Sequence, residues 1–168
     1  YLFVGMNKSS KELNLRSSNI WHLPNINYEE MINNFNEDPI NNEGPIFIGF
    51  PSAKDSDWDN RFPDKSNAVV ISLINYDYFK KWENTKLNKR GEDYDETKSI
   101  LTEKILQVLY KYYPQIEGNI DYLNLATPLT FNYYLNSNKG EIYGINCSKN
   151  RFIKNDWLLP ETHIKNLY

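Results

Sequence analysis

The sequence lacks the residue patterns of most well-known catalytic and metal sites. It contains seven glycines in 168 residues, and none falls in a G-x-G-x-x-G or Walker pattern, so no phosphate-binding loop is indicated. The two histidines, His22 and His163, lie far apart and have no cysteine or carboxylate at metal-ligand spacing. We therefore expect structural or surface roles for both histidines and no metal site.

Cysteine, long apolar runs and clustered positive charge are also scarce. The single cysteine, Cys147, cannot form an internal disulfide, and beside an apolar segment it is expected to be a packed thiol. No stretch approaches the roughly 20 apolar residues that cross a bilayer, which leaves peripheral membrane contact as the alternative. The net charge is −3 and acids are mixed with bases, so nucleic-acid binding is not expected.

The sequence does contain interspersed strand-like and helix-like segments. Apolar or alternating runs predict strands at residues 2–6, 19–23, 46–50, 68–74, 120–125 and 141–145, and the polar stretch 55–65 predicts a loop. The run at 68–74 is β-branched and nearly continuous, as expected of a central strand buried on both faces. Three- and four-residue spacing predicts helices at 28–35, 94–113 and 128–135, the second with Asp95 as its N-cap. Because no strict βαβ repeat is present, we predict an α+β fold, with a mixed sheet and covering helices.

Both ends of the chain are expected to lie inside a longer polypeptide. The chain opens on the apolar run 1–5 without an initiator methionine, and it closes at 166–168 just as another extended run begins. Complete domains usually begin and end in polar residues. We therefore expect residues 1–168 to be one part of a larger protein.

Three segments depart from the ordinary pattern of strands and helices. Residues 50–55 place a proline, small residues and a charge pair after a buried strand, where sites are commonly built, although residue chemistry alone favours a capped turn with a local Lys54–Asp55 pair. Residues 126–134 pass through Thr-Pro into a tyrosine-bearing helix, and the alternative is an ordinary helix start. Residues 140–144 carry flanking glycines that allow close approach of a flat ligand, or simply form a hairpin strand. The 15% aromatic content suits a planar apolar ligand or an ordinary core.

Taken in order, these segments resemble the retinol saturase family, which lies within the carotenoid isomerase and phytoene-desaturase-like FAD-dependent oxidoreductases. The resemblance covers almost the whole chain with its spacings kept. The motifs that carry it are FPSAKD at 50–55, RFP at 61–63, YFKKW at 78–82, RGEDY at 90–94, YPQIEG at 113–118, TPL at 127–129, YYL at 133–135, YG at 143–144, LPET at 159–162 and IKNLY at 164–168.

The resemblance implies a large FAD-dependent enzyme that acts on a conjugated polyene, most simply by saturating the 13,14 double bond of all-trans-retinol. The Gly-rich fingerprint that holds FAD in the family is missing, so residues 1–168 would be the substrate-side portion of an amine-oxidase-like fold without its Rossmann part, inactive alone. The implied cofactor-binding residues are Thr127, Pro128, Leu129, Tyr143 and Gly144. The implied substrate-cavity residues are Pro51, Ser52, Ala53, Lys54, Asp55, Tyr133 and Tyr134. The phenols of Tyr133 and Tyr143 are the candidate proton donors.

Several alternatives stay open within and outside this family. The same flavin and apolar tunnel would serve a carotenoid cis–trans isomerase or desaturase. Alternatives of another class are a non-catalytic module that binds a polyene or lipid, and a structural or interaction domain without a ligand. NAD(P)H is the expected reductant if the flavin needs one. The resemblance implies association with the endoplasmic reticulum membrane in a eukaryote and a cytoplasmic protein otherwise.

Overall fold

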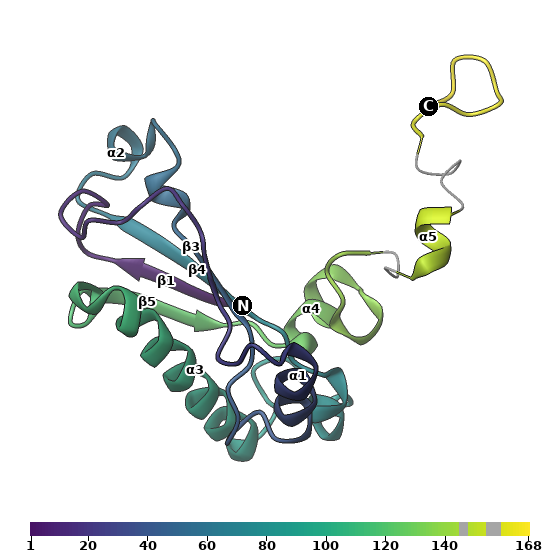
Figure 1. The fold of residues 1–168 in the computed structure, drawn as a ribbon, viewed down its shortest axis with the longest axis horizontal. Coiled ribbons are helices and arrows are strands. Elements are labelled where there is room, and N and C mark those ends of the chain that lie inside the picture. The colour runs from purple at the N-terminus through teal and green to yellow at the C-terminus, as the bar shows by residue number, and fades with distance from the viewer. Residues whose placement is uncertain (145–147, 154–158) are drawn as a thin grey trace.

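A computed structural model describes residues 1–144, 148–153 and 159–168, and its centre is one antiparallel sheet (Figure 1). The sheet has five strands in the order β2-β3-β4-β1-β5. Every neighbouring pair is antiparallel. The strands are β1 (Leu2–Met6), β2 (Ile20–His22), β3 (Ile46–Gly49), β4 (Ser66–Ser72) and β5 (Ile120–Leu125). The α+β prediction is confirmed, whereas the prediction of a mixed sheet is wrong, because no parallel pair occurs among these strands.

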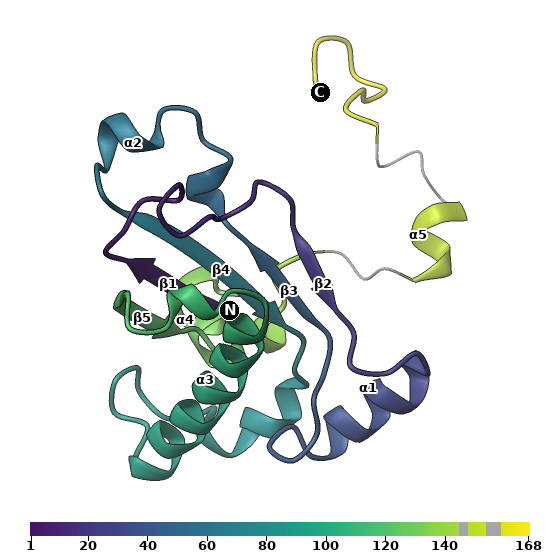
Figure 2. The same ribbon diagram turned by 60° about the vertical axis from the view of Figure 1, so that its left-hand side comes forward.

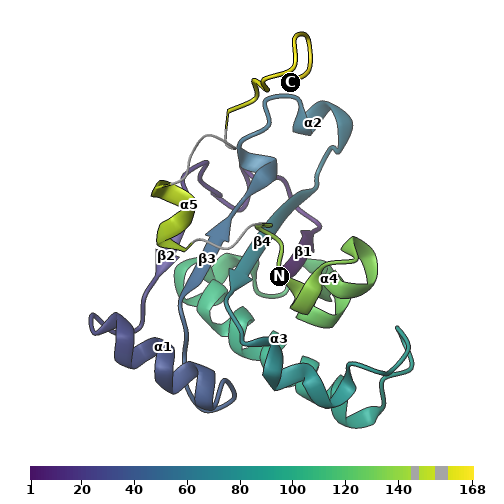
Figure 3. The ribbon, with the colours of Figure 1, turned by 90° about the vertical axis from the view of Figure 1, so that its right-hand side faces the viewer.

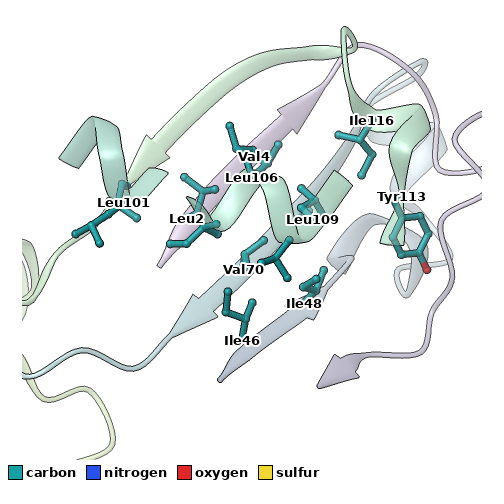
Figure 4. Packing of buried hydrophobic residues seen from close by; sticks show 14 of the residues in the cluster. Leu2, Val4, Ile46, Ile48, Val70, Leu101, Leu106, Leu109, Tyr113 and Ile116 are labelled. Atoms are coloured by element: carbon teal, nitrogen blue, oxygen red, sulfur yellow. The ribbon is translucent and has the colours of Figure 1, made fainter. Parts of the chain in front are cut away.

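One face of the sheet forms the hydrophobic core against a long helix, α3 (Glu92–Tyr112) (Figure 2). Strand pairing places Leu2, Val70 and Ile48 in one row, and each of them is fully buried. Figure 4 shows α3 contributing Leu101, Leu106 and Leu109 from the facing side. With the buried Ile105 and Val108 included, the buried positions of α3 recur at three- and four-residue spacing, which explains why this side of the helix is the buried one.

The opposite face of the sheet is apolar and only partly covered. It carries Phe3, Phe47 and Ile71, which pairing places on the side away from α3, and Trp21 beside Phe47 is 71% exposed. Consequently β4, although it is the central strand as predicted, alternates between buried and half-buried residues. The prediction that both of its faces are buried is therefore not met within this chain.

The remaining helices are short, and all but the last of them lie near the ends of the sheet (Figures 1 and 3). They are α1 (Tyr28–Glu37), α2 (Trp58–Arg61), α4 (Pro128–Leu135) and α5 (Lys149–Ile153), with 3₁₀ turns at Pro51–Ala53, Tyr76–Trp82, Pro114–Ile116 and Asn138–Gly140. Helix α4 begins as predicted, at a proline, and Thr127 and Thr130 form a reciprocal capping box. Helix α2 replaces part of the predicted 55–65 loop.

Two boundaries differ from the sequence prediction for physical reasons. Helix α3 begins at Glu92, with Gly91 rather than Asp95 as its N-cap, because Gly91 adopts a φ of 102° that L-residues avoid. Residues 141–144 form no strand, since Gly140 ends a 3₁₀ turn packed on Pro128. The rest of the predicted 141–145 strand, and Cys147, lie outside the described residues.

Candidate functional site

A cleft of about 1040 Å³ opens at the end of the sheet where β4 and β5 finish and β1 begins. One wall comes from these strand ends together with the start of α4 and the segment after it, and the other comes from the α1–β3 connection and one side of α3. The volume is at the upper end of the range typical of small-molecule pockets, about 300 to 1,000 Å³. This end of the sheet thus provides room for an extended ligand.

The strand-end wall of the cleft is mainly apolar. It is formed by side chains from the end of β4 and the loop after it, the junction of β5 with α4, and helix α4 itself: Ile71, Leu73, Ile74, Ala126, Pro128 and Phe131. The rings of Phe131 and Tyr1 pack in a T-shaped arrangement, with ring centres 5.3 Å apart. An apolar, aromatic wall of this kind binds hydrocarbon better than charged or strongly polar groups.

The opposite wall carries polar groups, and Lys104 of α3 is the central one. Its ammonium donates to the carbonyl oxygens of Pro39, Ile40 and Asn42, which uses all three N–H bonds and ties the α1–β3 connection to α3. Burial lowers the pKa of Lys104, while the carboxylates of Asp38 and Glu43 act in the opposite direction. Lys104 therefore fixes this wall and has no N–H bond left for a ligand.

Two tyrosine hydroxyls meet at the cleft. The Oη atoms of Tyr1 and Tyr143 are 3.3 Å apart, and both residues line the cavity. Burial raises the pKa of Tyr1 to about 12, and the contact with Tyr143 acts in the same direction. Sequence reasoning singled out Tyr143 but missed Tyr1, because only the pairing of β1 with β5 brings residue 1 next to the segment after α4.

The predicted cofactor residues divide into two groups. Thr127, Pro128, Tyr143 and Gly144 line the cleft. Leu129 is 2% exposed and belongs to the core instead. Thr127 is equally buried, and its hydroxyl already contacts those of Tyr94 and Thr130.

The two tyrosines predicted from helix α4 lie outside the cleft. Tyr133 and Tyr134 are 61% and 67% exposed, and their rings pack edge-on against each other. Neither residue lines the cavity. Helix α4 presents Phe131 to the cleft and these two phenols to the outside.

The loop predicted to shape the cavity also lies away from the cleft, at the opposite end of the strands (Figure 1). It consists of Pro51, Ser52, Ala53, Lys54 and Asp55. Ser52 is hydrogen-bonded to Ser10 and Asn67, Lys54 to Asn19, and Asp55 to Arg61. The physical reason is the antiparallel order. Strands β4 and β5 both run opposite to β1 and therefore finish at the same end of the sheet. Strand β3 runs opposite to β4 and finishes at the other end. The expected local Lys54–Asp55 pair is likewise replaced by partners from other segments.

His22 has the structural environment that was expected, since it is 4% exposed and both ring nitrogens have partners. His163 is exposed near the end of the chain. Within the described ranges, no group of three or more His, Cys, Asp or Glu side chains is arranged to hold a metal ion. None of the helices in those ranges has the length and apolar character needed to cross a bilayer.

Comparison with known proteins gives one consistent result. No family model and no solved structure gives a significant match. The chain is 35% identical over 173 residues to a Danio rerio protein named all-trans-retinol 13,14-reductase, which covers 99% of this chain and 28% of that protein. It is 30% identical over 174 residues to the Rattus norvegicus protein of the same name, again covering 99% and 28%. A further Danio rerio protein, named inactive all-trans-retinol 13,14-reductase, is 29% identical over 132 residues, or 76% of this chain and 22% of that protein. The chain therefore spans little more than a quarter of the length of the first two relatives.

Proposed function

Because this chain belongs to the retinol saturase family, we propose that it is the substrate-side part of a larger FAD-dependent oxidoreductase that saturates the 13,14 double bond of all-trans-retinol. The observation that carries this proposal is the alignment of 99% of the chain with two proteins named for that reaction. Because the alignment covers 99% of the chain, it includes the sheet, α3 and α4, which form the cleft.

The cleft supports a polyene as the ligand. A retinoid is a long conjugated hydrocarbon with a single small polar end, and burial of its apolar surface supplies most of its affinity. The strand-end wall offers Ile71, Leu73 and Phe131 to such a chain. The half-exposed sheet face around Phe3 and Phe47 offers further apolar surface next to this wall. The chain's own contribution is to bind and orient the polyene and to exclude water from it.

The residues at the cleft are compatible with a flavin on its open side. A Cβ atom added to Gly144 would meet no atom within 4 Å, so the backbone there is accessible to a flat ring. Pro128, Tyr143 and Gly144 are the residues we propose for contact with the isoalloxazine, whereas the hydroxyl of Thr127 and the side chain of Leu129 are engaged internally. Bound FAD would supply the hydride for saturation, with NAD(P)H as a candidate reductant of the flavin.

Saturation also needs a proton, and we propose Tyr143 as its donor. Tyr143 lines the cleft, and its hydroxyl has the hydroxyl of Tyr1 as a neighbour. After Tyr143 gives up its proton, Tyr1 can donate a hydrogen bond to the phenolate. Tyr1 can donate because a phenol is protonated at neutral pH, and burial raises the pKa of Tyr1 further from that range, to about 12.

A second candidate function is a non-catalytic module that binds a polyene. The observation that favours it is the relative named inactive all-trans-retinol 13,14-reductase, which is 29% identical to this chain. Such a protein would use the same apolar cleft for binding without the reaction. Carotenoid isomerisation and desaturation remain the alternatives within the enzyme class, because they need the same kind of apolar tunnel.

One experiment separates these functions. The full-length protein that contains this chain would be purified, its visible spectrum recorded, and all-trans-retinol added anaerobically after chemical reduction of the protein. The proposal predicts flavin absorbance and a product that carries two added hydrogen atoms by mass spectrometry. Retinol binding without that product would favour the non-catalytic module. A folded protein that shows neither flavin absorbance nor retinol binding would refute the proposal.

A further inference from the structure

Arg90 is buried beside the cleft without an acidic partner. It is 9% exposed, and its guanidinium donates to the carbonyl oxygens of Trp82, Thr85 and Leu129 at 3.0 to 3.3 Å. A further bond goes to the Thr85 hydroxyl. Within the described part of the chain, no carboxylate forms an ion pair with it. Burying a cation among neutral groups costs free energy. What Arg90 provides, and an apolar side chain of the same size could not, is a rigid set of N–H donors for these carbonyl oxygens.

Tyr94 lies in the first turn of α3, four residues after Arg90, and its side chain contacts the same segment that contains Leu129. It is 5% exposed, and its hydroxyl is 2.8 Å from Oγ1 of Thr127, which is itself 2% exposed. Arg90 precedes Gly91, the N-cap of α3, and its guanidinium carbon lies 5.4 Å from the centre of the Tyr94 ring. One residue therefore holds Leu129 through its carbonyl, and the other holds Thr127 through its hydroxyl.

The segment held in this way, residues 126–129, forms part of the cleft. Ala126, Thr127 and Pro128 line the cavity, whereas Arg90 and Tyr94 do not. The 3₁₀ turn Asn138–Gly140 then rests on this segment, because a Cβ atom on Gly140 would lie 2.5 Å from the Pro128 carbonyl oxygen. Tyr143 and Gly144 follow directly. A shift of residues 126–129 would thus move every group proposed above for the flavin and the proton.

We propose that Arg90 and Tyr94 are positioning residues, which set the turn at 126–129 and through it the alignment of polyene and flavin in the cleft. The inference rests on the proposed function for its catalytic consequence. Its structural part, that these two side chains fix the turn, stands independently of any ligand.

The test uses the full-length protein with Tyr94→Phe, Arg90→Lys and Thr127→Val, and with Tyr112→Phe as the matched control. Tyr112 lies at the far end of the same helix, and its hydroxyl is also hydrogen-bonded, with Nδ1 of His22. Hydrogen exchange of the amides at 126–131 is expected to accelerate about tenfold in Tyr94→Phe and Arg90→Lys, because a lost buried hydrogen bond is worth roughly that factor. It should be unchanged in Tyr112→Phe.

Steady-state kinetics with all-trans-retinol provide the second readout. In Tyr94→Phe we expect kcat to fall about tenfold or more with KM nearly unchanged, because misplacing reacting groups affects orientation while the apolar surface still binds. Thr127→Val removes the other half of the Tyr94–Thr127 bond together with the N-terminal cap of α4, so it should lower the melting temperature more than Tyr94→Phe does and lower kcat at least as much. The double variant should lower kcat no further than Thr127→Val alone, because both single changes break the same bond, and additive losses in kcat would contradict a shared role of that bond.

The outcomes distinguish this inference from the proposed function. Unchanged exchange at 126–131 in both Tyr94→Phe and Arg90→Lys would overturn the inference whatever the activity. Faster exchange in a protein that binds but does not reduce retinol would support the positioning of the turn and count against the proposed reaction. Faster exchange with full kcat would show that the turn is held but does not align the reacting groups, which contradicts the catalytic part.

Discussion

The imidazole of His22 joins the sheet to the rim of the cleft, since its Nε2 atom lies 3.0 Å from Oε1 of Glu43. The other ring nitrogen is 2.9 Å from the hydroxyl of Tyr112 on α3. One buried ring thus connects β2, the α1–β3 connection and α3. In either protonation state both nitrogens can be satisfied, because the Tyr112 hydroxyl can donate or accept.

Replacing His22 with leucine is expected to destabilise the protein by about 1 to 3 kcal/mol. Leucine fills the space but leaves Glu43 and Tyr112 without their shared partner. Both are partly exposed and can turn toward water, which limits the loss. Denaturant unfolding of His22→Leu beside Tyr112→Phe measures it, and equal midpoints for His22→Leu and the unmodified protein would rule out this role.

Lys104→Met is expected to loosen the cleft wall at residues 39–42. The methionine retains the apolar stem of the side chain but cannot bind the three carbonyl oxygens. Faster amide exchange confined to 39–44 is the expected result. Lys111→Met is the control, because Lys111 lines the same cleft from the same helix and is exposed.

The same substitution has a pH signature. Burial lowers the pKa of Lys104 below its ordinary value of 10.5. At pH values between the lowered pKa and 10.5, the folded protein therefore binds fewer protons than the unfolded chain. Stability should therefore rise with pH as it approaches 10.5, and Lys104→Met should lack this contribution. A slope that is identical in Lys104→Met and the unmodified protein would contradict the assignment.

The sequence predicted the helices and strands of this fold better than it predicted which segments lie together at the cleft. The periodicity of α3 and the β-branched run of β4 are local signals, and both elements were found near their predicted positions. The cleft depends on strand direction, which periodicity does not indicate, so the sequence could not show that residues 51–55 lie at the other end of the sheet from the cleft. Thr127 was singled out by resemblance, but nothing local indicated that Tyr94 would occupy its hydroxyl.

Gly140→Ala tests whether the 3₁₀ turn must rest on Pro128. The added Cβ atom would lie 2.5 Å from a backbone oxygen, which cannot move away as a side chain can, and the φ of 68° adds a backbone penalty. Gly118→Ala is the matched control, because it has a similar φ of 78° with no atom within 4 Å. We expect Gly118→Ala to cost about 1 to 2 kcal/mol and Gly140→Ala clearly more. Equal unfolding midpoints would mean that the contact with Pro128 is not tight.

The pairing of Tyr1 with Tyr143 predicts how the first of these phenols titrates. Burial, and to a smaller extent the contact with Tyr143, raises the pKa of Tyr1 from 10.0 to about 12, so the stability that this group contributes is complete below pH 10 and is lost as the pH rises through 12. Tyr143→Phe removes the contact while keeping the ring, and we expect the phenolate absorbance of Tyr1 to appear at lower pH in that variant. Subtracting the titration of Tyr1→Phe isolates this signal from the other tyrosines. If Tyr143→Phe leaves the titration of Tyr1 unchanged, the two hydroxyls do not interact, and Tyr1 cannot stabilise the phenolate that proton donation by Tyr143 would leave behind.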